Sequence, residues 1–439
     1  MFPSVAWRSA QASNAVRKYG PKRCMSTKSD EGAAGPLAGV KVVEVGNFIA
    51  GPHCATILAY YGAQVIKVEP PGGDQIRKFR DVDENGVSWW WRSIGRNKKS
   101  IVLDLKKAGA QDIVRDLCLD ADVLLENFRP GKMEAWGLGP DDIRSLKPDI
   151  VYTRVSGYGQ HGPYHKRPGF ASACEAMGGF RYVNGFPDRE SVRPNLSMGD
   201  TLAGVNAALG TVMALFALQK GNCKSSQVVD SSIYESVFGL MEGVLPDYDG
   251  AGIVREKSGS TVTGIVPTNT YPTKDGKSVV IGSNSDALFK RLMIAIGRQD
   301  IASDPKYSDN QKRVKHQKFL DGLIADWTRK MDSSQIINVV DDAQVPNGLI
   351  YSIEDIVNDP HYNSRGMIEE VDVPSLGRSL KIPGMSPKLS VNPGKTLFAG
   401  PELGEHTEEI VYDLLGYSSD KVDSLVATGC IEWPKKLDT

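Results

Sequence analysis

The residue best placed for covalent chemistry is Asp200, which ends the run RPNLSMGD at residues 193–200. An extended, proline-bearing stretch gives way there to an apolar segment. Its large side chains recur at helical spacing: Leu202, Val205, Leu209, Val212, Met213 and Phe216. The pattern predicts a buried helix over residues 201–218 with Asp200 as its N-cap. Helix N–H groups and the helix dipole would keep that carboxylate ionised, and a fixed, ionised carboxylate can act as a nucleophile. An ordinary capping aspartate fits the same position, so the rest of the chain must decide.

The elements that would position Asp200 alternate between short β-rich runs and helical patterns. Strands are expected at residues 40–45, 64–69, 100–105, 123–125 and 150–155, and helices at 54–61, 109–119 and 140–146. This alternation predicts an α/β fold with a parallel sheet covered by helices. Ligands of such sheets lie beyond the carboxyl ends of the strands, which here lead into residues 46–52, 127–131 and 156–162.

The chain divides by composition. Residues 1–36 hold no acid before Asp30 and several arginines and serines, which predicts a mitochondrial transit peptide and disordered tail, and hence a matrix location; a plain unstructured tail is the alternative. Residues 37–231 form the first part of a large domain, and 232–256 a linker. Residues 257–356 form a smaller α/β domain and 357–380 a second linker, after which 381–439 return to the large domain.

Charge and cysteine usage exclude several classes of protein. With 52 basic and 53 acidic residues among 439, the balance argues against a nucleic-acid or polybasic membrane partner. No apolar run approaches the roughly 20 residues of a membrane span. Six cysteines without a C-x-x-C pair indicate reduced thiols. No metal site is expected, because Pro163 and Pro168 spoil the helix that would aim His161 and His165 at one ion.

One glycine motif is misleading. Residues 157–162 match G-x-G-x-x-G after a predicted strand, but Pro163 follows directly. The dinucleotide fingerprint needs a helix that opens at this loop, so NAD binding is not expected there. A turn that brings backbone N–H groups close to another ligand fits better.

Several segments together resemble one family. They are VVEVGNFIAGP at 42–52, GAQVIKVE at 62–69, RNKKSIVLD at 96–104, ENFRPG at 126–131, SGYG at 156–159, MGD at 198–200, DPHYNSRGM at 359–367 and LGEHT at 403–407. In this order they resemble the class III CoA-transferases (CaiB/BaiF-like), and look most like the branch that uses succinyl-CoA and dicarboxylic acids. The resemblance runs from about Leu37 to the C-terminus. It implies a Rossmann-like large domain with a parallel sheet, a smaller α/β domain and an interlocked homodimer.

The resemblance also implies roles for residues. Asp200 would attack the donor thioester to give a mixed anhydride and then an aspartyl-CoA thioester, with no metal and no permanently bound cofactor. Coenzyme A would contact Ile49, Ala50, Arg96, Asn97, Lys98, Asn127, Phe128, Arg129, Gly157, Tyr158 and Gly159. Gly282, Ser283 and Asn284 would form a lid loop that has one glycine only. Ala135 and Ser156 replace an arginine and a lysine of some relatives, which leaves Arg129 and Lys132 as candidate phosphate partners.

The expected substrates are an acyl-CoA, with succinyl-CoA as donor, and a free dicarboxylic acid of the glutarate, itaconate or hydroxymethylglutarate type. Arg167 or Arg193 is the candidate for its distal carboxylate. A 2-methylacyl-CoA racemase is one alternative. Its Gly-His-Asp triplet is replaced here by Gly169-Phe170-Ala171, and phenylalanine cannot move a proton. A catalytically silent CoA-binding protein is the other alternative, and the retained Asp200 argues against it.

Overall fold

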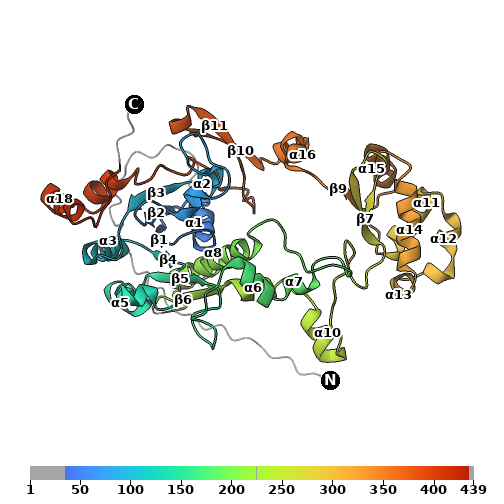
Figure 1. Ribbon diagram of the computed structural model, residues 1–439, viewed down its shortest axis with the longest axis horizontal. Coiled ribbons are helices and arrows are strands. Elements are labelled where there is room, and N and C mark those ends of the chain that lie inside the picture. The colour runs from blue at the N-terminus through green and yellow to red at the C-terminus, as the bar shows by residue number, and fades with distance from the viewer. Residues whose placement is uncertain (1–34, 224, 435–439) are drawn as a thin grey trace, which may run out of the picture. The chain divides into compact units, whose positions relative to one another are not determined.

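Six parallel strands form the central sheet of this computed structural model, which describes residues 35–223 and 225–434. They are β1 (Lys41–Val45), β2 (Gln64–Glu69), β3 (Lys98–Val102), β4 (Val123–Glu126), β5 (Val151–Ser156) and β6 (Val228–Ser232). Their order is β3-β2-β1-β4-β5-β6, and every neighbouring pair is parallel (Figure 1). The order reverses between β1 and β4, and ligands of such sheets bind at this reversal. The predicted parallel, Rossmann-like sheet is confirmed, although the sequence did not indicate β6.

Helices cover both faces of this sheet (Figure 1). On one face lie α3 (Ala108–Leu119), α5 (Pro140–Leu146) and, from the far end of the chain, α18 (Ser419–Ala427). Ile410, Val422 and Ile431 are buried in the same core cluster as Val43 of β1, so the C-terminal stretch packs on the large sheet. On the other face lie α1 (Ala50–Tyr60) and α8 (Met198–Gln219). The loop between β1 and α1 and the start of α8 are therefore supported from the same face.

A second core lies between residues 266 and 345. Three antiparallel strands, β7 (Thr268–Pro272), β8 (Ser278–Gly282) and β9 (Asn347–Leu349), pack with α11 (Asp286–Ala295), α14 (Gln317–Thr328) and α15 (Ser333–Asp342). This set matches the smaller α/β domain in content. The domain boundaries at 231, 256, 356 and 380 stay predictions. The transit-peptide prediction falls on residues 1–36, of which 1–34 lie outside the described residues.

The other elements are short. They are η1 (Gln75–Lys78), α2 (Trp89–Ile94), α4 (Lys132–Ala135), α6 (Ala171–Met177), α7 (Phe180–Val183), α9 (Ile233–Phe238), α10 (Val244–Ala251), α12 (Gln299–Ser303), η2 (Pro305–Tyr307), α13 (Asn310–Val314), α16 (Ile353–Asn358), α17 (Pro360–Ser364), β10 (Ile368–Val373), η3 (Pro374–Leu376), β11 (Arg378–Pro383) and the π-helical turn η4 (Glu409–Leu414).

Helix α8 differs from its prediction in two ways. Its small residues, not its large ones, face the protein, and they are Gly199, Ala203, Gly204, Ala207, Ala208, Thr211 and Ala214. Val205, Leu209, Val212, Met213 and Phe216 are exposed, because small side chains let α8 approach α1 closely. The helix is also long and apolar enough to cross a membrane by those two measures, contrary to the expectation from sequence. A core helix can pass the same test.

Candidate active site

The loop that follows β1 is held in place by fully buried charges. Lys67 Nζ lies 2.9 Å from carboxylate oxygens of both Glu44 and Asp74, and it donates to the carbonyl of Gly46 at 2.6 Å. Lys98 Nζ lies 2.9 Å from the second Glu44 oxygen and donates to the Pro52 carbonyl at 2.7 Å. The two lysines therefore fix both ends of the loop at residues 46–52. We name Glu44, Lys67, Asp74 and Lys98 the buried charge cluster.

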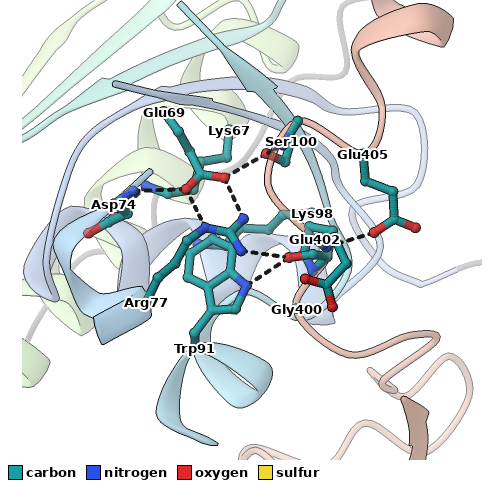
Figure 2. Close-up of polar contacts among 12 residues, drawn as sticks. Lys67, Glu69, Asp74, Arg77, Trp91, Lys98, Ser100, Gly400, Glu402 and Glu405 are labelled. Atoms are coloured by element: carbon teal, nitrogen blue, oxygen red, sulfur yellow. Dashed lines mark hydrogen bonds and ion pairs between the residues drawn. The ribbon is translucent and has the colours of Figure 1, made fainter. Parts of the chain in front are cut away.

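Neighbouring contacts extend this support. Figure 2 shows Arg77 and Ser100 converging on Glu69, with Arg77 forming a two-pronged pair at 2.7 Å on each side. Asp74 accepts from the backbone N–H of Phe48 at 2.9 Å, which ties the middle of the loop to the cluster. Burial alone would raise the pKa of Glu44, but Lys67 and Lys98 lower it below the ordinary value. The loop that carries Ile49 and Ala50 is thus built on a compensated, ionised base, and both side chains are themselves buried.

The predicted phosphate loop is engaged by the protein itself. Lys98 belongs to the buried charge cluster, and Arg96 donates to the carbonyls of Ser93 and Pro383 at 2.7 and 2.6 Å. The Asn97 amide bonds to the backbone of Lys395 and Leu397. All three side chains are buried, so none of them presents a free cation at the surface. Their assignment to coenzyme A stays a prediction, and the structure supports a positioning role.

The second strand-end loop is joined to the first. The Asn127 side chain accepts from the Asn47 N–H at 2.9 Å and donates to the Asn47 carbonyl at 2.8 Å. Phe128 packs edge-on against Trp136. Arg129 is exposed beside them and can meet a phosphate. Of the three charged residues predicted to contact coenzyme A, Arg96 and Lys98 are buried and Arg129 is exposed.

The third predicted loop, Gly157–Gly159, follows β5. The N–H of Gly159 donates to Ser156 Oγ at 2.9 Å, and Gly157 lies against Gly169 so closely that a Cβ would come 3.0 Å from the Gly169 Cα. Tyr158 lies 6.2 Å from the ring of Tyr234. The Gly159 N–H is thus satisfied within the protein, and a contact of this loop with coenzyme A stays a prediction.

Asp200 lies in the first turn of α8 but is not its N-cap. The helix begins at Met198 with Ser197 as N-cap, so Asp200 is the third helical residue. The pKa of Asp200 is also shifted in the direction opposite to the expected one. Burial, and then the negative charge of Glu175, raise it from 3.8 to about 7, and Arg193 opposes this rise. A carboxyl with this pKa is a stronger nucleophile when ionised than an ordinary aspartate.

Glu175 of α6, which no sequence pattern indicated, has a fully buried carboxyl whose charge acts on Asp200. Its Oε1 accepts from the N–H of Gly199 at 3.0 Å, and its Oε2 lies 3.6 Å from Arg181. A Cβ at position 199 would come 3.0 Å from the Glu175 Cγ and 2.9 Å from Ile233, so glycine is required there. The one hint in the sequence was an acid inside the otherwise small, uncharged run ASACEAM.

A cavity of about 470 Å³ opens beside the start of α8. Its lining is Ile49, Phe79, Arg80, Trp90, Arg193, Asn195, Leu196 and Ser197. Of the two predicted acceptor arginines, Arg193 therefore lines this cavity and also lowers the pKa of Asp200. Arg167 instead stacks on the Tyr164 ring at 3.7 Å and is not part of the lining.

The predicted lid lies at the end of β8. Ser283 is buried and its N–H donates to the Pro267 carbonyl at 2.9 Å, while the Asn284 carbonyl accepts from Arg313 at 2.7 Å. Gly282 pairs with Thr268 at the strand end. All three residues are thus held through their backbone, and the lid role stays a prediction.

The geometry also bears on a metal site and on the racemase alternative. Among residues 35–223 and 225–434, no group of three or more His, Cys, Asp or Glu side chains is arranged to hold a metal ion. Phe170, at the position of the racemase histidine, lies 5.8 Å edge-on from Phe48. An aromatic contact in place of an imidazole leaves no second base at this point.

Comparison with known proteins agrees with this arrangement. Residues 37–407 match the family described as CoA-transferase family III. The chain is 44% identical over 393 residues to succinyl-CoA–D-citramalate CoA-transferase of Chloroflexus aurantiacus, covering 89% of this chain and 97% of that one. It is 30% identical to succinyl-CoA:glutarate CoA-transferase of Mus musculus, covering 92% of each. A CaiB/BaiF family protein from Brucella suis has a similar structure, with a TM-score of 0.73, 28% identity and coverage of 87% and 100%.

Members of this family use CoA thioesters as substrates and need no permanently bound cofactor. The fold, the site and the match over most of the chain lead to one conclusion: the protein belongs to CoA-transferase family III and is a class III CoA-transferase.

Proposed function

We propose that the protein moves coenzyme A from succinyl-CoA to a dicarboxylic acid of the glutarate, itaconate or hydroxymethylglutarate type, with Asp200 as the nucleophile. The observation that carries the proposal is the half-buried Asp200 carboxyl in the first turn of α8, beside a cavity lined by arginine. Relatives named for succinyl-CoA with citramalate and with glutarate support the substrate class.

The chemistry proceeds by exchange of acyl groups on one carboxyl. An ionised Asp200 oxygen attacks the donor thioester carbon, the C–S bond breaks, and coenzyme A leaves as thiolate from a mixed anhydride. The thiolate then attacks the aspartyl carbonyl, which releases succinate and forms an aspartyl-CoA thioester. The acceptor carboxylate displaces the thiolate from Asp200 to give a second anhydride, and the thiolate attacks the acceptor carbonyl and frees Asp200. Anhydride and thioester conserve the energy of the donor, so no ATP is consumed.

The residues around Asp200 position the reacting groups and set the charge of its carboxyl. The buried charge cluster holds the loop at residues 46–52, and Glu175 holds the first turn of α8 through the N–H of Gly199. A fixed carboxyl beside a bound thioester gains from proximity, and its raised pKa increases its nucleophilicity. Arg193 keeps a fraction of Asp200 ionised near neutral pH.

Incubation with succinyl-CoA and a panel of free acids tests the proposal. Mass spectrometry should detect new thioesters of dicarboxylic acids and release of succinate. A protein that forms no new thioester with any acid of the panel would contradict it. Deuterium exchange at the α-carbon of a 2-methylacyl-CoA, without acceptor acid, would instead indicate a racemase.

We also propose a homodimer. The exposed face of α8 carries Val205, Leu209, Met213 and Phe216, and a contiguous apolar face of this kind is typical of a protein–protein interface. Light scattering should give the mass of a dimer for the wild type at micromolar concentration. The double variant Leu209→Glu, Met213→Glu should give a mass closer to that of the monomer. A monomeric wild type would contradict the assembly.

We propose a mitochondrial location as well. Imaging of the full chain with and without residues 1–36 tests it.

A further inference from the structure

Arg80 is a cation without a carboxylate partner at the active-site cavity. It lines the cavity beside Arg193 and the N-cap residue Ser197, and the described lining contains no acidic side chain. Among the described residues no Asp or Glu lies within ion-pair distance of Arg80. Its guanidinium rests 4.3 Å from the centre of the Trp90 ring, a contact that leaves the N–H edge of the group available.

The backbone conformation at Arg80 also indicates a ligand site. Its φ is 60°, in the left-handed region that residues other than glycine rarely adopt. The chain around it is fixed on both sides, because the Ser88 N–H donates to the Arg77 carbonyl and the Trp89 N–H to the Asp81 carbonyl. Such a conformation persists only where neighbouring structure enforces it, and it is concentrated at ligand sites. Here it directs a long cationic side chain to the cavity.

Arg193 and Arg80 differ in what they can still bind. Arg193 donates through Nη2 to the Leu196 carbonyl at 2.9 Å and through Nε to the Pro194 carbonyl at 3.3 Å. Two of its three nitrogens are therefore tied to its own loop. Arg80 makes no side-chain hydrogen bond within the described part of the chain, so its planar fork is available for a bidentate pair with a carboxylate.

We propose that Arg80 determines acid specificity by binding the distal carboxylate of the dicarboxylic acid, on the donor as succinyl and on the acceptor alike. This inference rests on the proposed function. Both acids bond to the same Asp200 carboxyl in turn. Asp200 lies three residues after Ser197, which lines the cavity together with Arg80, so we expect the far ends of both acids in this cavity. The distal carboxylate of a succinyl group is only three carbon–carbon bonds from the reacting carbonyl. The pantetheine arm, by contrast, separates the thioester from the CoA phosphates.

The test compares matched pairs of substrates in the full chain. Succinyl-CoA is compared with butyryl-CoA as donor, and glutarate with its monoamide as acceptor, so that each pair differs in the distal charge. Arg80→Ala and Arg80→Gln should lower kcat/KM for succinyl-CoA and glutarate about 10- to 100-fold, the range expected for a lost hydrogen-bonded charge pair. Rates with butyryl-CoA and the monoamide should stay within a few-fold of wild type. Arg80→Lys should retain part of the preference, because it keeps the charge and loses the fork.

Arg189→Ala is the matched control. Arg189 also lies over an aromatic ring, 5.2 Å from the centre of Phe186, and it does not line the cavity. It should leave the preference unchanged. If Arg80→Ala and Arg80→Gln keep the full diacid preference, or lower both members of each pair equally as loss of a CoA-phosphate contact would, the inference is wrong while the proposed function stands. A wild type that transfers coenzyme A to no acid would instead refute the proposed function.

Discussion

Two groups of carboxylates, one below the loop at residues 46–52 and one at the start of α8, have opposite electrostatic states. In the buried charge cluster, Lys67 pairs with both Glu44 and Asp74, and Lys98 pairs with Glu44. The pKa of Glu44 is lowered despite complete burial. At the start of α8, Asp200 has a second carboxyl, Glu175, as its neighbour and one exposed arginine as compensation, and its pKa is raised to about 7. Burial raises both pKa values, and the number of adjacent cations decides the outcome.

The difference separates structure from chemistry. A carboxylate paired with two ammonium groups is fixed in one charge state and can hold a loop, but it is a poor nucleophile. A carboxyl left short of cations is costly to bury when ionised, and this cost is what makes it reactive. The raised pKa of Asp200 is therefore consistent with its proposed chemistry.

The largest expected effect is on catalysis. Asp200→Asn removes the carboxyl that is to be acylated, so CoA transfer should fall by at least about 10³-fold. The fold should survive. A carboxyl with a raised folded pKa destabilises the protein increasingly as the pH rises from its ordinary pKa of 3.8 to about 7, so the Tm of the variant relative to wild type should increase between pH 4 and pH 8. Asp188→Asn, an exposed position, is the control and should change neither transfer nor this trend.

The buried charge cluster should show its importance in stability. Lys67→Met leaves Glu44 and Asp74 short of one cation, and the free energy of unfolding should fall by about 3–5 kcal/mol. Lys41→Met removes an exposed lysine paired with Asp120 and should cost no more than about 1 kcal/mol. Urea denaturation of the three proteins measures both values. Equal, small losses for both variants would show that the cluster does not support the loop.

A smaller effect is expected from removing the charge of Glu175 beside Asp200. Glu175→Gln keeps an oxygen that can accept from the Gly199 N–H but removes the negative charge. The Asp200 pKa should fall, so the acid limb of the rate profile should move to lower pH, and the rate at pH 6 relative to that at pH 8 should rise a few-fold. Glu175→Ala loses the hydrogen bond as well and should also lower Tm. An acid limb that does not move in Glu175→Gln would show that the two carboxyls are not coupled.

The sequence predicted much of the large sheet because its strands are short, β-branched runs separated by helical patterns. The strands at residues 64–69 and 150–155 were placed within one residue. The strand at 100–105 was predicted to begin two residues and to end three residues too late, because β3 begins with two lysines that look like a surface turn. β6 was missed because its second half is polar, Asp230-Ser231-Ser232.

The site was less predictable, for a physical reason. Asp200 was identified from the proline-to-helix change, but its raised pKa depends on burial and then on Glu175, which lies 25 residues earlier in the chain. Lys98 looked like a phosphate ligand because nothing in the local sequence shows that Glu44 lies across the sheet from it. Arg80 has no motif, and its position at the cavity follows from a backbone conformation that composition does not reveal.

The most direct measurement is chemical mapping of Asp200 during turnover. The protein is mixed with succinyl-CoA, quenched rapidly in hydroxylamine, digested and analysed by mass spectrometry. A hydroxamate on Asp200, absent from Asp200→Asn, is the predicted result, because hydroxylamine captures both an aspartyl anhydride and an aspartyl thioester. Sustained CoA transfer in a protein whose Asp200 is never modified would contradict the account.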